Sequence, residues 1–169
     1  AKTTVEAAKR IYQKLSRPNI MIKIPGTPEC LPAIEETLAE GINVNVTLLF
    51  SEENYVKVAE AYIRACEKRV AAGKDTSKLA SVASFFVSRV DALCEKNVDQ
   101  QIAAGKITAE TKDSLTGKIG IANSKCAYSA FEKLFKGQKF SALAANGVRV
   151  QRPLWASTGT KNPAFKAVM

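Results

Sequence analysis

One lysine stands inside a short apolar run that is otherwise typical of a buried strand. The run is IMIKIP, residues 20–25, and Lys23 has an isoleucine on each side. Burial disfavours the charged form of a lysine and leaves its neutral amine available as a nucleophile. Attack of an amine on a ketone gives a carbinolamine and then an iminium, an electron sink that permits cleavage of the neighbouring carbon–carbon bond. Lys23 is therefore the first candidate catalytic residue.

Further polar residues occupy comparable positions in three later apolar stretches: Asn45 and Thr47 in INVNVTLLF, Ser84 and Arg89 in VASFFVSRV, and Ser157 in VRVQRPLWAST. Asn45 can donate to a substrate hydroxyl, and Thr47 could hold a water for proton transfer. Arg89 could bind a phosphate through its planar guanidinium. Because the sequence contains no histidine, proton transfer would fall to carboxylates, hydroxyls or water.

Each of these residues also has a structural interpretation. Lys23 could be ion-paired or could extend its ammonium to solvent at the strand end. Asn43 and Asn45 could belong to an internal hydrogen-bond ladder, the serines could simply pack well, and Arg89 could pair with Asp91. What favours function is that the candidates share one location, the ends of successive strands.

Strands alternate with helices along the chain. The apolar runs predict strands at 20–24, 42–50, 82–90 and 153–157. Helical periodicity and capping residues predict helices over 3–16, 28–40, 51 to about 70, 91–105, 108–135 with a break near 117–120, and 140–145. No linker or internal repeat is visible, so residues 1–169 are expected to form a single domain.

This alternation predicts an α/β fold with a parallel sheet and right-handed crossovers. The second expected strand helps to decide between an open doubly wound sheet and a barrel, because one of its faces is polar and the other is apolar. Its alternating residues are Asn43, Val44, Asn45, Val46, Thr47 and Leu48. A parallel strand covered on both faces should be almost continuously apolar. A polar row that points into a barrel interior, toward the mouth at the carboxyl ends of the strands, explains the pattern better.

Composition and charge exclude several classes of protein. The 169 residues contain no apolar run near the ~18 that a membrane span needs, and residues 1–16 lack the apolar region of a signal peptide. With no histidine and no CxxC pair, the separated cysteines do not indicate a zinc site and are expected to be reduced thiols: Cys30, Cys66, Cys94 and Cys126. The lysines behind the net charge of +9 are scattered among acidic residues, which weakens a nucleic-acid interpretation. A mild positive field would also suit an anionic small molecule, and neither use follows from the charge alone. A module that binds nucleic acid or anions stays the alternative from another class.

Three stretches together, RPNIMIKIPGT, EGINVNVTLLFS and QRPLWASTGTKNP, closely resemble the transaldolase family, in particular its bacterial and plant type. The resemblance covers essentially the whole chain. It implies a (β/α)8 TIM barrel that needs neither cofactor nor metal, in the pentose phosphate pathway of the cytoplasm, or of a plastid in a plant. Such an enzyme moves a dihydroxyacetone unit through a lysine Schiff base, interconverting sedoheptulose 7-phosphate plus glyceraldehyde 3-phosphate with erythrose 4-phosphate plus fructose 6-phosphate. A related Schiff-base aldolase, which releases the free aldol product, is the nearest alternative.

The resemblance also implies a role for each candidate. Lys23 matches the Schiff-base lysine, Asn45 the asparagine that contacts the dihydroxyacetone unit, and Thr47 the threonine that orders the catalytic water. Ser84 matches a substrate-contacting serine.

For the phosphate end, Arg89 matches the first phosphate-binding arginine, and Ser157 matches a serine that helps to hold the substrate. The second phosphate arginine of the family has no clean match. Lys161 is the candidate substitute, in a loop whose spacing differs from that of the family.

By the same resemblance, the chain corresponds to barrel strands four to seven. Strands one to three and eight are then absent, together with the family's aspartate on strand one and glutamate on strand three. We expect an incomplete barrel of about four parallel strands that exposes its edges and self-associates through them. Its expected substrates are sugar phosphates. The chain alone should nevertheless be inactive or nearly so as a transaldolase. A catalytically incomplete fragment that serves only as a structural or anion-binding module is the alternative function.

Overall fold

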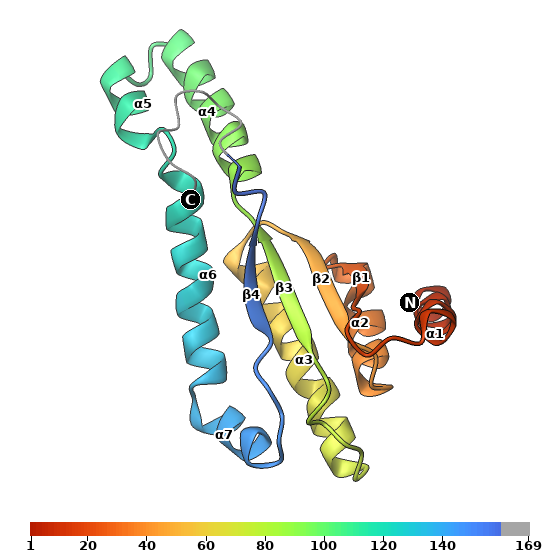
Figure 1. Ribbon diagram of the computed structural model, residues 1–169. Helices are drawn as coiled ribbons and strands as arrows, with labels where there is room; N and C mark the ends of the chain where they lie inside the picture. The colour runs from red at the N-terminus through yellow and green to blue at the C-terminus, as the bar shows by residue number, and fades with distance from the viewer. Residues whose placement is uncertain (160–169) are drawn as a thin grey trace.

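A computed structural model describes residues 1–159 of the chain (Figure 1). Within this part, the strands are β1 (Ile22–Pro25), β2 (Val44–Leu49), β3 (Ser81–Phe86) and β4 (Arg152–Ala156). The helices are α1 (Lys2–Leu15), the 3₁₀ turn η1 (Pro28–Cys30), α2 (Leu31–Ala39), α3 (Glu52–Ala71), α4 (Ser88–Ala103), α5 (Ala109–Leu115), α6 (Ile119–Phe135) and α7 (Gln138–Ala145). Every predicted strand and helix is therefore present.

The strands form one parallel sheet in the order β1-β2-β3-β4, which is also their order along the chain. Each crossover thus leads to the next strand in the same direction. Because such crossovers share one hand, they place their helices on the same face of the sheet, as in a barrel wall. A doubly wound sheet would reverse its strand order. The sheet of the described residues is not closed, which confirms the predicted incomplete barrel of four parallel strands.

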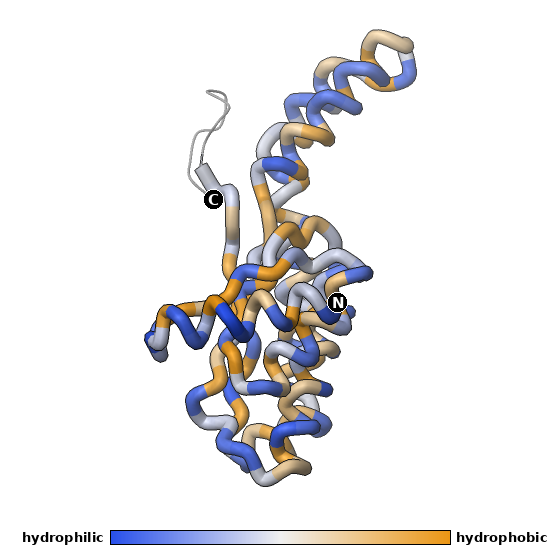
Figure 2. Tube along the Cα trace, turned by 90° about the vertical axis from the view of Figure 1, so that its right-hand side faces the viewer, coloured by the Kyte–Doolittle hydropathy of each residue, from blue (hydrophilic) through white to orange (hydrophobic). Residues whose placement is uncertain are grey.

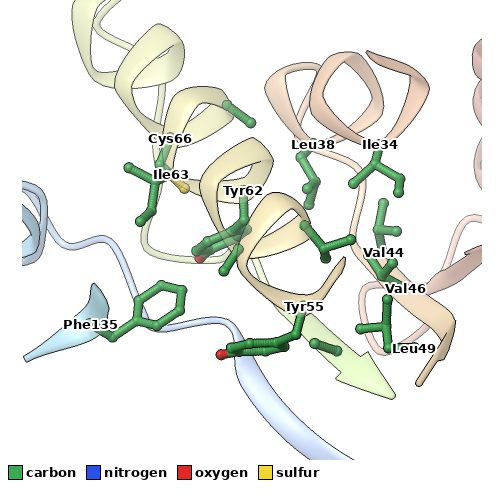
Figure 3. Close-up of a cluster of buried hydrophobic side chains, with 14 of the residues drawn as sticks. Ile34, Leu38, Val44, Val46, Leu49, Tyr55, Tyr62, Ile63, Cys66 and Phe135 are labelled. Atoms are coloured by element: carbon green, nitrogen blue, oxygen red, sulfur yellow. The ribbon is translucent and has the colours of Figure 1, made fainter. Parts of the chain in front are cut away.

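The hydrophobic core lies between the sheet and helices α2 and α3, and side chains of α6 and α7 extend it (Figure 3). Helix α3 begins where the sequence predicted, because the Ser51 side chain accepts from the backbone N–H of Asn54. Acidic residues occupy its first turn and basic residues its last, which complements the helix dipole. The fully buried side chains include Ile34, Leu38, Val44, Val46, Leu49, Tyr55 and Tyr62.

A β-bulge corrects the predicted alternation on β2. Val46 pairs with Ala83 and Leu49 with Phe85, so β2 carries one more residue than β3 between these pairs. Leu48 is the residue that adopts a left-handed backbone, with φ of 62°. Because of this extra residue, the side chains after the bulge point to the opposite face from the one that strict alternation predicts. Leu49, rather than the predicted Leu48, therefore enters the core, where it is 0% exposed.

The predicted strand 82–90 is wrong in its second half, because β3 ends at Phe86 and α4 begins at Ser88. The backbone N–H groups of Val87 and Ser88 still donate to the end of β4, at Ala156 and Ser157. The N–H of Val90 instead donates back to Val87, which opens the helix. The β-branched residues of this segment are compatible with a strand locally, but these contacts decide the outcome.

Helices α4 and α5 form a hairpin that projects beyond the ends of the strands (Figures 1 and 2). It rises from the carboxyl end of β3, and α6 then runs back along the molecule. No helix within residues 1–159 is both long and apolar enough to cross a membrane.

Candidate active site

The structure brings Lys23, Asn45 and Ser84 together on one face of the sheet. Lys23 and Asn45 are in-register partners on β1 and β2. Their neighbours Ile24 and Val46 are buried in the core, so Lys23 and Asn45 point away from it. From β3, the Ser84 hydroxyl donates to Asn45 Oδ1 at 2.7 Å. The predicted cluster of polar groups on the inner face of the barrel wall is therefore present.

The environment of Lys23 differs from the prediction. The sequence indicated a buried lysine, whereas Lys23 is exposed. The reason lies in the sheet, because α2 and α3 pack on its other face and β1 pairs only with β2 among the described residues. Only one side of the IMIKIP strand is covered, so the apolar run reflects contact of Ile24 with the core and not burial of the lysine.

Thr47 is 4% exposed and lies opposite Pro25 at the end of β1. Its backbone oxygen accepts from the N–H of Gly26 at 2.7 Å, which keeps the ends of β1 and β2 together. Within residues 1–159, the Thr47 hydroxyl oxygen is buried and has no hydrogen-bond partner. A buried hydroxyl without a partner is costly, and a bound water molecule could satisfy it.

Ser88, which precedes Arg89, contacts Ser157 where β3 and β4 end. The hydroxyls of Ser88 and Ser157 lie 2.8 Å apart, and the Ser88 N–H donates to the Ser157 carbonyl. Arg89, in the first turn of α4, places its guanidinium carbon 5.1 Å from the centre of the Phe86 ring. This contact holds the exposed guanidinium beside the strand ends.

The alternative pairing of Arg89 with Asp91 does not occur among the described residues. Asp91 is 1% exposed and accepts instead from the backbone N–H of Gly120, at 2.7 Å. Its carboxylate therefore satisfies a donor in the first turn of α6, where negative charge is favourable.

Two asparagines that the sequence did not single out connect the loops at this end of the sheet. Asn54 of α3 donates to the Gly26 carbonyl after β1, at 2.7 Å. Asn123 of α6 donates to the Phe50 carbonyl after β2, at 2.8 Å. Asn54 follows the Ser51 cap by three residues, a signal that could have pointed to it. Nothing local distinguishes Asn123, which contacts a residue 73 positions away.

Asn43, which precedes β2, has the structural role that was left open. Its amide nitrogen donates to the carbonyls of Pro18 and Ile20, and its amide oxygen accepts from the N–H of Ala80. It thereby joins the loops before β1, β2 and β3 at the end opposite the candidate site. Asn45, two residues later, is half-buried and belongs to the candidate site.

The two asparagines should respond differently to truncation. Asn43→Ala leaves three backbone groups without their partner, and we expect a loss of about 3 kcal/mol in the free energy of unfolding. Asn45→Ala, the matched control on the same strand, removes one contact and should cost about 1 kcal/mol or less. Urea denaturation of both variants measures the difference. Equal losses would contradict this assignment.

One candidate, Lys161, lies outside the described residues. Among residues 1–159, no group of three or more histidine, cysteine, aspartate or glutamate side chains is placed to hold a metal ion. Two grooves of the described residues also lie elsewhere. One is lined by α2 and α3, and the other by α6, Val87, Trp155 and Thr158.

Comparison with known proteins gives a consistent result. Residues 1–169 match the family described as Transaldolase/Fructose-6-phosphate aldolase. The chain is 52% identical to transaldolase 2 of Nostoc sp. strain PCC 7120, over 98% of this chain and 44% of that protein. It is 49% identical to the transaldolase of Trichodesmium erythraeum, over 99% of this chain and 44% of that protein. Identity to the transaldolase of Mycolicibacterium paratuberculosis is 50%, over 96% of this chain and 42% of that protein. The chain thus spans less than half the length of these relatives.

Proposed function

Because the chain belongs to the transaldolase/fructose-6-phosphate aldolase family, we propose that it carries the Schiff-base part of a transaldolase active site. The reaction transfers a dihydroxyacetone unit from a ketose phosphate to an aldose phosphate. The observation that carries the proposal is the in-register pairing of Lys23 with Asn45 on the inner face of a parallel barrel wall. An amine and an amide donor on adjacent strands can hold one small ketose between them.

The proposed chemistry starts from the neutral amine of Lys23. Its nitrogen attacks the keto carbon of fructose 6-phosphate, and the carbinolamine loses water to give an iminium. As the C4 hydroxyl gives up its proton, the C3–C4 bond breaks, its electrons enter the iminium as an enamine, and glyceraldehyde 3-phosphate leaves. The enamine then attacks the aldehyde of erythrose 4-phosphate. Hydrolysis of the new iminium releases sedoheptulose 7-phosphate and restores the amine.

The other candidates have supporting roles in this proposal. Asn45 donates to a hydroxyl of the three-carbon unit. The Thr47 hydroxyl, which has no partner within residues 1–159, supports a role in holding the water. Arg89 binds the substrate phosphate through its planar guanidinium, beside Ser157. No carboxylate lies among these residues, so the C4 proton passes to water or to a group outside the cluster.

Reduction with borohydride in the presence of fructose 6-phosphate tests the proposal. We expect the mass of the intact chain to increase by one reduced three-carbon or sugar unit, and no increase without the sugar phosphate. Glucose 6-phosphate at the same concentration is the control for non-specific reaction of an aldehyde with surface lysines. Equal labelling by both sugars would contradict a built Schiff-base site.

The exposure of Lys23 favours a second possibility, a fragment that binds the substrate or other anions without turnover. Water around the amine weakens the electrostatic contacts of the site. The sheet edges at β1 and β4, which have no partner strand within residues 1–159, also support self-association, since such edges are templates for pairing. Adduct formation without multiple turnover would indicate this incomplete site. Sedimentation over a range of concentrations would detect the association.

A further inference from the structure

The contact between Ser84 and Asn45 joins two strands on the inner face of the sheet. Asn45 pairs in register with Val82, so Ser84 lies two residues further along β3 and contacts Asn45 diagonally. The Ser84 hydroxyl donates to Asn45 Oδ1 at 2.7 Å. Ser84 is 3% exposed, whereas Asn45 is half-buried and borders the open face. The serine is therefore the less accessible member of the pair.

This contact decides which way the Asn45 amide faces. An amide offers an acceptor oxygen on one side and an NH₂ donor on the other, and rotation by 180° exchanges them. With the oxygen toward Ser84, the buried hydroxyl proton has an acceptor. In the reversed orientation that proton would have none among the described residues, and leaving a buried donor unpaired is costly. Ser84 thus favours the orientation in which Asn45 directs its NH₂ group away from β3.

Asn43 on the same segment of chain shows what a purely structural asparagine does here. Its amide makes three hydrogen bonds to backbone groups, to Pro18, Ile20 and Ala80. Asn45 uses only its oxygen, and its two amide protons have no protein acceptor within residues 1–159. A donor that is oriented but unused, in register with Lys23, is suited to a ligand oxygen.

We infer that Ser84 is a positioning residue, which orients the Asn45 amide so that its NH₂ group meets an oxygen of the unit bound to Lys23. This inference rests on the proposed function for the ligand, but the orientation itself is a property of the free protein. It differs from the role that the family resemblance implies for Ser84, which is direct contact with the substrate. The burial of Ser84 and its hydrogen bond to Asn45 favour the indirect role.

Two measurements on the full chain test the inference. The first is the side-chain amide signal of Asn45 by ¹⁵N NMR without substrate. In Ser84→Ala, we expect its two amide protons to shift toward the values of a free asparagine and the amide to become mobile. Ser84→Thr, which keeps the hydroxyl, should restore the wild-type signal. Ser81→Ala, on the opposite face of β3, removes a buried hydroxyl that donates to Val44 and should leave the Asn45 amide unchanged.

The second is a double-mutant cycle on the rate of borohydride-trapped adduct formation. Ser84→Ala should slow trapping about 3- to 10-fold, the range of one hydrogen bond. If Ser84 acts through Asn45, adding Ser84→Ala to Asn45→Ala should slow it no further. Multiplied losses, or an unchanged Asn45 amide in Ser84→Ala, would overturn the inference.

Two outcomes need separate controls. If the wild-type chain forms no adduct, the proposed function fails, and the NMR comparison alone still decides whether Ser84 orients the amide. If Ser84→Ala does not fold, Ser84→Cys keeps the volume with a weaker donor and should show the same changes to a smaller extent.

Discussion

Lys23→Met should reduce the borohydride-trapped adduct to background while leaving the fold intact. Methionine has no amine, so no carbinolamine can form at this position. Lys23 is exposed and lies on the open face of the sheet, so its replacement should change the free energy of unfolding by about 0.5 kcal/mol or less. Intact mass after reduction measures the first effect, and urea denaturation the second.

Two further variants separate the nucleophile from its charge. Lys23→Arg keeps the positive charge but stays protonated, and should also give no adduct. Lys133→Met removes another exposed lysine, on α6 and outside the candidate site, and should leave the yield unchanged. An adduct yield in Lys23→Arg equal to that of the wild type would mean that another lysine reacts.

Gly120→Ala should lower the free energy of unfolding by about 3 kcal/mol. A Cβ atom at this position would lie 2.6 Å from Asp91 Oδ2 and 2.9 Å from the carbonyl oxygen of Val87. The backbone at Val87 cannot move without disturbing the start of α4, and Asp91 holds the Gly120 N–H. The added methyl group therefore breaks the contact that joins α4 to α6.

Urea denaturation of Gly120→Ala measures this loss. Gly159→Ala is the matched control, because a Cβ atom there would meet no atom of the described residues within 4 Å. Since Arg89 lies in the first turn of α4, Gly120→Ala should also weaken binding of fructose 6-phosphate more than that of unphosphorylated fructose. A free energy of unfolding within 0.5 kcal/mol of the wild-type value would contradict this prediction. It would show that α4 and α6 separate easily and that the contact between Asp91 and Gly120 does not stabilise the fold.

The sequence predicted the elements well, because their signals are local. Ser51 with two acidic residues after it marks the start of α3, and the apolar runs mark the strands. It also placed Lys23, Asn45 and Ser84 on one face, since neighbouring parallel strands fix which residues share a side. These predictions depend only on the spacing of polar and apolar residues and on the order of the strands along the chain.

What the sequence missed depends on contacts between distant segments. The bulge at Leu48 appears only in the pairing of β2 with β3, and it sends Leu49 into the core. Asp91 was considered as a partner of Arg89, but Gly120, 29 residues away, takes its carboxylate. The exposure of Lys23 depends on what covers the inner face of the sheet, which no local pattern records.

Peptide mapping of the reduced adduct tests the central claim, that Lys23 is the nucleophile, most directly. After reduction of the wild-type chain with fructose 6-phosphate, digestion and mass analysis should place the added unit on the peptide that contains Lys23. The sequence has many other lysines, so the location is a stringent result. An adduct spread at equal yield over other lysine peptides would contradict the account and leave Lys23 without a chemical role.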